Sequence, residues 1–475
     1  MVGRRNTVKP EDYERIGRIS ASQDAGNKEL AAKLLCDELD KDPNDPQALY
    51  LLGYVLSTTD KHGLAYSLSK RATELHPNEA AIWHNLGKHC WDMQRYEEAE
   101  GYWRRALKIN PNFVNSLDGL GLANLNKCEY GMAIEYASRA LMVAPGMMDS
   151  TVNRAMAYLA LKKWKEGWEG YNANVGNNKD RKVIIYGDET PWKGEKNKDV
   201  VVIGEQGIGD EISFGSCLPD LIRDSKSVTI ECDKRLEGVF RRSFPTCSVY
   251  GTRYDETTRS WAEGRDFDHR VLIGELPQFY RNNDADFHGE PYLVADPHMR
   301  IQWKALLESL GDKPKIGIAW TGGRNHTGKS RRSVTLETYL PLMKAVDATW
   351  VSLQYHTPTE LEAFEERHGI KVWHWPHGVQ SYDYDQTLAL ISELDLVISV
   401  TTTVIHAAGA LGKECWCLVP KKDTWRYLTE GKWFPWAKSV TMYRQKGNEW
   451  PIHLLAAKLR ERYAQRHNEL QQSRV

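Results

Sequence analysis

The first third of the chain carries apolar stripes separated by polar positions at the spacing of amphipathic helices. The stretch AAIWHNLGKHCWDMQRYEEAEGYWRRALKINPN, residues 80–112, contains two such stripes with a polar turn between them. Pro43, Pro77, Pro111 and Pro145 follow one another at a constant interval of 34 residues. A helix interior does not accept proline, so each proline marks the end of a helix and the start of a turn. The pattern predicts a helical hairpin repeated every 34 residues.

Three further sets of small residues keep the same period. They are Gly53, Gly87 and Gly121, followed by Ala155; Ala65, Ala99 and Ala133; and Ala72, Ala106 and Ala140. Small residues let the two helices of a hairpin approach closely, and the pattern resembles the tetratricopeptide repeat. It predicts a repeat domain at 46–178, with repeats at about 46–79, 80–113, 114–147 and 148–176. A degenerate helical segment, 1–45, precedes it.

After Asn178 the pattern changes to a polar, turn-rich linker at 179–199 and then to short apolar runs. The runs are VVVIG (200–204), VTIEC (228–232), VLIGELP (271–277), KIGIAW (315–320), WVSLQ (350–354), KVWHW (371–375), LDLVISV (394–400) and CWCLVP (415–420). Short apolar strands that alternate with helices indicate parallel, doubly wound sheets. The sequence therefore predicts two Rossmann-like domains, at 200–314 and 315–475. Their ligand site is expected where the carboxyl ends of the two sheets face each other.

Composition and charge narrow the class of protein. A length of 475 residues favours two or three domains, and 41% hydrophobic with 27% charged residues is typical of globular proteins with full cores. A net charge of −1 gives no general attraction to nucleic acid or anionic membranes. The chain has no apolar run long enough to span a membrane and no signal-peptide core, so we expect a cytoplasmic protein. Eight cysteines without a CxxC pair predict buried thiols rather than a disulfide or zinc framework.

Several motifs follow one another across the two predicted Rossmann-like domains. They are PWKGE, GEQGIGDEISF, WTGG, SLQ and LDLVISVTTTVIHAAGALGK. Together they resemble GT-B glycosyltransferases of the heptosyltransferase type, most closely the bacterial and phage members with N-terminal tetratricopeptide repeats. A looser similarity extends to the protein O-GlcNAc transferases. The resemblance covers roughly 46–470, and it implies that the first Rossmann-like domain binds the acceptor and the second binds a sugar-nucleotide donor.

The motif GEQGIGDEISF carries the acceptor-side chemistry under this resemblance. Gly207 and Gly209 let the backbone turn tightly beside a substrate, and Gln206 belongs to the same loop. Asp210 sits at a helix N-terminus, where a positioned carboxylate can take the proton of an acceptor hydroxyl. The resemblance implies this role of base for Asp210, with Glu211 as the substitute candidate. As an alternative, Asp210 caps its helix, a role that contributes about 1 kcal/mol and no catalysis.

The motif VTTTVIHAAGALG follows a buried strand and opens a helix. Free N–H groups from Thr402 onward, together with the helix dipole, make a site for a diphosphate. The hydroxyls of Thr402 and Thr403 add donors, and the resemblance implies that His406, one turn later, is catalytic and binds the donor. Many relatives have Asp where this chain has Thr401, so donor identity and activity stay open. A plain helix cap and a structural histidine are the alternatives.

The stretch WTGGRNHTGKSRRSV contains a second phosphate-binding pattern. Residues 323–330 fit the P-loop sequence GxxxxGK[ST], but the residues that follow predict a loop where a P-loop helix would begin, and no strand ends in an Asp for magnesium. Under the resemblance, Lys329, Arg331 and Arg332 supply positive charge to the donor diphosphate. A solvated basic loop is the alternative.

Three weaker signals complete the candidate residues. Gln354 ends a predicted strand, where it either contacts the nucleotide or has only a structural role. Asp383 and Asp385 form a DxD ahead of a helix, which we interpret as a cap or a nucleotide contact rather than a metal site. GT-B transferases generally use no metal, and the sequence shows no His/Cys ligand cluster. The segments DTWRYL (423–428) and KWFPW (432–436) place aromatic residues beside charge, either to stack on a ligand or to pack a domain boundary.

The sequence thus predicts a metal-independent, inverting glycosyltransferase that uses a nucleotide-diphosphate sugar as co-substrate and needs no further cofactor. The acceptor is a glycan, a protein or a hydroxylated nucleobase in DNA. The repeats recruit the acceptor or a protein partner, or form a homodimer; as an alternative, they are a structural spacer packed against the second half of the chain. The change at Thr401 motivates an alternative, a catalytically inactive GT-B-like scaffold. A P-loop ATPase is a third hypothesis.

Overall fold

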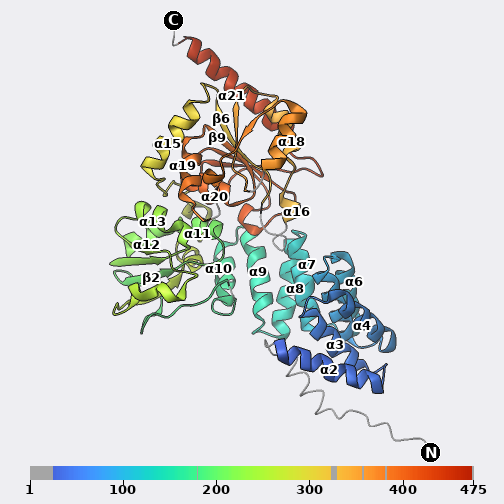
Figure 1. The fold of residues 1–475 in the computed structure, drawn as a ribbon. Coiled ribbons are helices and arrows are strands. Elements are labelled where there is room, and N and C mark those ends of the chain that lie inside the picture. The colour runs from blue at the N-terminus through green and yellow to red at the C-terminus, as the bar shows by residue number, and fades with distance from the viewer. Residues whose placement is uncertain (1–24, 179, 323–328, 356–357, 380–381, 473–475) are drawn as a thin grey trace, which may run out of the picture. The chain divides into compact units, whose positions relative to one another are not determined.

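The structure is a computed structural model that describes residues 25–178, 180–322, 329–355, 358–379 and 382–472 (Figure 1). The chain divides into two compact units, Met1–Ala157 and Tyr158–Val475. Among the described residues, no helix combines the length and the apolar character needed to cross a bilayer.

The first unit consists of helices that pair in sequence order. They are α2 (Ala25–Lys41), α3 (Pro46–Ser57), α4 (His62–Leu75), α5 (Ala80–Asp92), α6 (Tyr96–Ile109), α7 (Val114–Asn126), α8 (Tyr130–Val143) and α9 (Met148–Ala160), of which α9 crosses into the second unit. Helix α3 packs on α4, α5 on α6 and α7 on α8, which is the arrangement that the period of 34 residues predicts. The prediction of helical repeats is confirmed.

The small residues of the repeat lie where helices touch. The periodic alanines from Ala65 to Ala140 are fully buried. A Cβ on Gly87 would lie 2.6 Å from Nε1 of Trp103, and one on Gly119 would lie 2.8 Å from Cδ2 of the same ring. Trp103 on α6 therefore fits between α5 and α7 only because both helices carry glycine at the contact.

The second unit begins within the last predicted repeat. Helix α10 (Trp164–Tyr171), which the sequence assigned to the repeat domain, packs within this unit. The indole Nε1 of Trp168 donates to the carbonyl of Arg281 (2.7 Å), and that of Trp164 donates to Oδ1 of Asp284 (2.8 Å). These buried contacts make α10 part of the α/β unit, although its amphipathic pattern continues the repeat.

Two parallel sheets form the second unit. The first contains β1 (Thr190–Pro191), β2 (Asp199–Ile203), β3 (Ser227–Glu231), β4 (Ser248–Tyr250) and β5 (His269–Leu272), in the order β1-β5-β2-β3-β4. The second contains β6 (Lys315–Ala319), β7 (Thr349–Ser352), β8 (Val372–Trp373), β9 (Leu396–Val400), β10 (Cys415–Val419) and β11 (Val440–Arg444), in the order β11-β10-β9-β6-β7-β8. All neighbouring strands pair in parallel. The predicted parallel α/β architecture is confirmed.

Helices lie between the strands, and α21 follows the last strand, β11. They are α11 (Ile208–Gly215), α12 (Leu218–Asp224), α13 (Glu237–Ser243), α14 (Pro277–Tyr280), α15 (Pro297–Glu308), α16 (Lys329–Arg332), α17 (Leu340–Met343), α18 (Pro358–His368), α19 (Asp385–Glu393), α20 (Thr403–Ala410) and α21 (Ile452–Gln472). Short 3-10 helices lie at Asn172–Asn174, Lys234–Leu236, Glu256–Ala262, Ile273–Glu275, Asp284–Asp286, Leu336–Tyr339, Pro376–Val379 and Trp425–Tyr427. Helix α15, which the sequence placed in the first Rossmann-like domain, packs on α19 of the second sheet, where Trp303 Nε1 donates to Gln386 Oε1 (2.9 Å).

Candidate functional site

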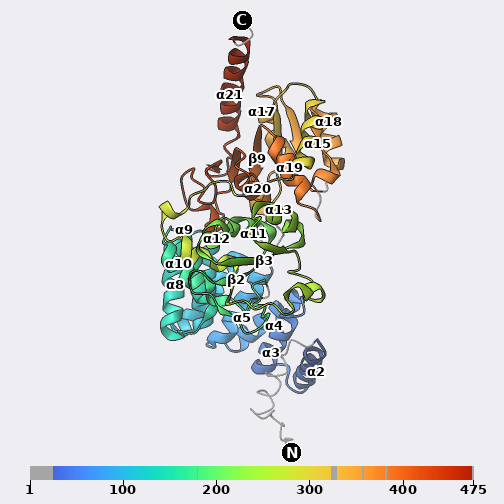
Figure 2. The ribbon, with the colours of Figure 1, turned by 90° about the vertical axis from the view of Figure 1, so that its left-hand side faces the viewer.

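Helices α11 and α20 each start just beyond the carboxyl end of a central strand, and they pack against each other (Figures 1 and 2). The two helices come close together at Gly209. A Cβ on Gly209 would lie 3.2 Å from Oγ1 of Thr403 and 3.6 Å from Cδ2 of His406. The glycine therefore brings the GEQGIGDEISF turn into direct contact with the first turn of α20, so the two main motifs of the sequence form one site.

The turn before α11 differs in detail from the prediction. The left-handed residue is Gln206, with φ of 60°, whereas Gly207 has φ of −96°, which any residue can adopt. The tight turn thus depends on Gln206, and Gly209 serves the contact between the helices. The backbone N–H of Gly207 donates to Oδ2 of Asp210 (3.2 Å), so one carboxylate oxygen of Asp210 caps the helix.

The other oxygen of Asp210 forms an ion pair that the sequence analysis missed. Its Oδ1 lies 2.6 Å from Nη2 of Arg426, and the side chains of Arg426 and Asp210 are 14% and 27% exposed. The same Nη2 donates to Oε1 of Gln206 (3.2 Å) and to the hydroxyl of Tyr171 (3.3 Å), which also accepts from Nε2 of Gln206 (2.7 Å). Burial lowers the pKa of Arg426, but Asp210 together with Tyr171 and Tyr427 outweighs burial, so the pKa is raised and Arg426 remains a cation.

His406 is buried and neutral. Its Nδ1 lies 2.7 Å from Oγ of Ser213, and this hydroxyl lies 2.8 Å from the carbonyl of Gly209. Because a carbonyl can only accept, the Ser213 hydroxyl donates to Gly209 and accepts from the Nδ1–H of His406. Nε2 then accepts from the hydroxyl of Tyr427 (3.2 Å). Burial lowers the pKa of His406 to about 4, so both ring nitrogens have protein partners and the ring carries no charge at neutral pH.

The loop between β9 and α20 leads directly into the first turn of α20. Thr402 is the N-cap residue of α20, and its side chain makes no capping hydrogen bond. The first N–H groups of a helix have no partner within the helix, and they attract anions. A Cβ on Gly322 would lie 2.9 Å from the carbonyl of Thr401, so the WTGG motif also lies directly against this loop.

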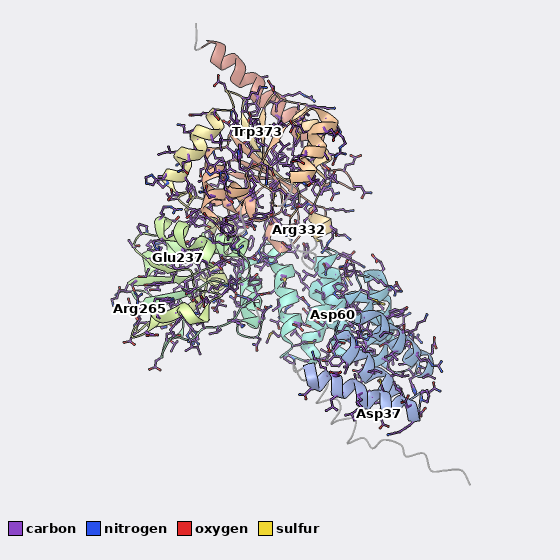
Figure 3. All side chains as sticks on the ribbon, in the orientation of Figure 1. Asp37, Asp60, Glu237, Arg265, Arg332 and Trp373 are labelled. Carbon is purple, nitrogen blue, oxygen red and sulfur yellow. The ribbon has the colours of Figure 1, made fainter. Side chains whose placement is uncertain are left out.

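A carboxylate stands beside Thr401, the position where many of the resembling transferases have Asp. It belongs to Asp423, which follows β10 in the DTWRYL segment. Burial raises the pKa of Asp423 to about 6, while the Thr401 hydroxyl and the charges of Arg332 and Arg331 act to lower it. Both arginines lie on α16, where Figure 3 marks Arg332. Arg331 and Arg332 thus lie near enough to Asp423 for their charges to act on its carboxylate.

Other predicted residues lie away from this cluster. Glu211, the substitute base, is fully buried, pairs with Arg253 and accepts from the N–H of Asp233 (3.1 Å). Burial raises the pKa of Glu211 to about 7. Because this carboxylate points into the protein core, we do not retain Glu211 as a candidate base. Gln354 uses its Oε1 to accept from the N–H of Thr321 (3.0 Å), a contact that ties β7 to the end of β6.

The remaining predicted positions have local structural roles or are outside the described residues. Asp383 accepts from the N–H of Asp385 (2.9 Å), and Asp385 pairs with Arg242, which fits a helix cap. The P-loop pattern at 323–330 lies mostly outside the described residues. Lys329 is exposed and begins a one-turn helix, α16, where the sequence predicted a loop. The described part of the chain contains no group of three His, Cys, Asp or Glu side chains placed to hold a metal ion.

A buried ion pair fixes α10 to the turn before α11. Nε of Arg181 lies 2.5 Å from Oε2 of Glu205, with both side chains almost fully buried. Nη1 of Arg181 donates to the carbonyl of Tyr171 (2.6 Å) and to Asn174 Oδ1 (2.9 Å). The Tyr171 hydroxyl is held in this way beside Gln206. No local sequence signal marks Tyr171 as a site residue, because its helix continues the repeat pattern.

A comparison with known protein families supports the repeat assignment. The family model described as tetratricopeptide repeat matches residues 80–113, so the first unit contains a tetratricopeptide repeat. PilF of Pseudomonas aeruginosa is 22% identical, with a TM-score of 0.32 over 35% of this chain and 76% of that structure. MamA residues 41 to the end, from Desulfovibrio magneticus RS-1, is 19% identical, with a TM-score of 0.31 over 36% of this chain and 94% of that structure.

A curated relative matches a larger part of the chain. Protein FlbA of Caulobacter vibrioides (strain ATCC 19089 / CIP 103742 / CB 15) is 30% identical over 305 residues, which is 61% of this chain and 51% of FlbA. The chain thus spans about half the length of this relative.

Proposed function

We propose that the second unit is a GT-B glycosyltransferase that moves a sugar from a nucleotide-diphosphate sugar to an acceptor hydroxyl. The observation that carries this proposal is the contact at Gly209, which joins the Asp210 turn to the first turn of α20. A carboxylate for the acceptor and an anion-attracting helix start for the donor thereby lie side by side. Both follow carboxyl ends of parallel strands, where ligands bind in open α/β folds.

The proposed reaction assigns a role to each side chain. The acceptor oxygen attacks the anomeric carbon and Asp210 takes its proton, while the bond from that carbon to the phosphate oxygen breaks and the nucleoside diphosphate leaves. The negative charge of the leaving diphosphate grows at the start of α20, near Arg331 and Arg332. Since His406 has both ring nitrogens bound by Ser213 and Tyr427, we assign it to positioning α20 rather than to proton transfer.

In this proposal, Asp423 replaces the aspartate that many of the resembling transferases have at the position of Thr401. It lies beside Thr401, so the chain offers a carboxylate from another loop where the resembling transferases place one on the strand end. This arrangement favours an active enzyme over the inactive scaffold. The tetratricopeptide repeats recruit the acceptor or a protein partner, and the acceptor is a glycan, a protein or a hydroxylated nucleobase.

A donor-binding screen tests the proposal. Purified full-length protein is titrated by calorimetry with ADP-, UDP-, GDP- and CDP-sugars, alongside Arg332→Gln and the matched control Arg367→Gln, which removes an exposed arginine of α18 paired with Glu337. We expect one donor class to bind, about tenfold more weakly to Arg332→Gln, and unchanged to the control. If no donor binds the wild type, the transferase proposal is wrong and the inactive scaffold becomes the better account.

A further inference from the structure

Arg426 is the cation nearest the proposed base, and it uses only part of its hydrogen-bonding capacity. Its Nη2 contacts Asp210, Gln206 and Tyr171, whereas its Nε is buried and has no hydrogen-bond partner within the described residues. The guanidinium carbon lies over the Trp425 ring, 4.4 Å from its centre, so an aromatic face covers one side of the cation.

The position of Arg426 connects it to the donor side. It follows β10 in the same short segment as Asp423 and Tyr427, and Tyr427 bonds to His406 on α20. The charges of Arg426 and Arg332 both lower the pKa of the His406 ring, so both arginines lie near it. The charge of Arg426 would therefore attract a diphosphate held at the start of α20. Arginine is also the side chain best suited to bind phosphate oxygens through two donors.

In the structure, Arg426 also binds the carboxylate of Asp210, which must accept a proton in the proposed reaction. An aspartate oxygen held by a guanidinium at 2.6 Å is already occupied, so it is poorly available to an acceptor hydroxyl. Asp210 is further fixed by the N–H of Gly207, so both carboxylate oxygens have partners.

We propose that Arg426 is a latch on Asp210 that the diphosphate group of a bound nucleotide opens, by taking the guanidinium as its own partner and so freeing the carboxylate. This inference rests on the proposed function, which it deepens by naming the group that senses the donor. The diphosphate competes with Asp210 for one cation, so part of its binding free energy is used to break the Asp210–Arg426 pair. Gln206 and Tyr171 hold Arg426 in its closed position.

This arrangement predicts an effect opposite to that of an ordinary binding residue. Removing the carboxylate in Asp210→Asn removes the competitor, so nucleoside diphosphate binds about tenfold more tightly than to the wild type. Removing the cation in Arg426→Gln weakens binding about tenfold. In the double variant the affinity equals that of Arg426→Gln within about twofold, because no latch remains to be opened.

The test is a double-mutant cycle on the full-length protein with ADP, UDP, GDP, CDP and inorganic pyrophosphate as probes, read by calorimetry. Tyr171→Phe removes a hydroxyl that holds Arg426 in its closed position, with little change of shape. We expect this variant to bind the probes more tightly than the wild type, as Asp210→Asn does. Thermal unfolding of each variant identifies any that fail to fold; if Arg426→Gln fails to fold, Arg426→Lys takes its place in the cycle.

The outcomes separate the latch from the proposed function. If the tightening by Asp210→Asn persists unchanged in the Arg426→Gln background, the carboxylate merely repels the diphosphate and the latch is overturned. If Asp210→Asn binds a nucleotide no more tightly than the wild type, the latch is overturned while the donor site stands. If no probe binds any of the proteins, the donor site itself fails and the proposed function falls with it.

Discussion

At the scale of single residues, the hydrogen bonds of His406 define its role. The ring is neutral, with an Nδ1–H that donates to Ser213 and an Nε2 that accepts from Tyr427. Because the Ser213 hydroxyl is already committed to the Gly209 carbonyl, this one tautomer satisfies every group. His406 thereby links α20 to α11 on one side and to the segment after β10 on the other.

Replacing Ser213 tests this assignment. Ser213→Ala leaves the buried Nδ1–H without its acceptor, so we expect the free energy of unfolding to fall by about 1 to 3 kcal/mol. The matched control is Ser216→Ala on the next turn, whose hydroxyl donates to a helix carbonyl, that of Ser213 (2.7 Å), and whose loss should cost about 0.5 kcal/mol or less. Denaturant unfolding measures both; equal effects would show that Ser213 does not hold His406.

A second buried histidine predicts how stability depends on pH. His89 on α5 is fully buried, and neither ring nitrogen has a hydrogen-bond partner among the described residues. Burial lowers its pKa from 6.5 to about 4; Lys88 and His62 act in the same direction, and Asp92 opposes them. Below pH 6.5 the unfolded chain binds a proton at His89 that the folded chain excludes. The contribution of His89 to the free energy of unfolding is therefore fully present above pH 6.5 and is lost as the pH falls to about 4.

The loss due to His89 amounts to about 3 kcal/mol by pH 4. His89→Gln removes the titration at similar size, and its free energy of unfolding should decline less steeply between pH 7 and 4, by that amount. Urea unfolding followed by circular dichroism at several pH values measures the difference. Parallel pH curves for the wild type and His89→Gln would contradict a neutral, buried His89.

At the scale of elements, the contact between α11 and α20 depends on the absence of one side chain. Gly209→Ala places a Cβ 3.2 Å from Thr403 Oγ1, so either this side chain or the helix spacing must give way slightly, and we expect a loss of about 1 to 3 kcal/mol of stability together with weaker donor binding. Gly207→Ala is the matched control, because the nearest atom to its Cβ is Asp210 Oδ2 at 3.5 Å and its φ suits alanine. Thr403→Ala should partly rescue Gly209→Ala. A tolerated Gly209→Ala would remove the basis for a shared site.

The apolar pattern identified most central elements. Strands β6, β9 and β10 are buried at every position, so their sequences are continuous apolar runs that predict strands directly. The pattern missed β1, β4 and β11, because two of them have only two or three residues and all three include exposed or half-buried positions. Helix α10 was assigned to the repeats, since an amphipathic helix shows one apolar face without showing what covers it.

The site was predicted only in part for a similar reason. Asp210, Thr403 and His406 follow strands in recognisable motifs, and the structure brings them together at Gly209. Arg426 lies more than two hundred residues from Asp210 in the chain, and nothing in the local sequence of either residue indicates their ion pair. The predicted role of Gly209 as a turn residue was also wrong, because that role belongs to Gln206.

At the scale of the whole molecule, the chain joins a repeat array to a two-sheet α/β unit. Tetratricopeptide arrays present surfaces to other macromolecules, and the α/β unit carries the proposed chemistry, so the two units divide recruitment from catalysis in our account. The net charge of −1 describes the chain as a whole, whereas Arg331, Arg332 and Arg426 concentrate positive charge near the start of α20.

The central claim is that the site at α11 and α20 transfers a sugar from a nucleotide-diphosphate donor, with Asp210 as the base. The most direct measurement is the rate of nucleoside diphosphate release at saturating donor, for the wild type, Asp210→Asn and the control Asp286→Asn, whose carboxylate bonds the backbone N–H groups of Asn282 and Asn283. We predict slow release by the wild type and the control, and release at least about 100-fold slower by Asp210→Asn although it still binds donor. Equal rates in the wild type and Asp210→Asn, or no release from any donor, would contradict the account.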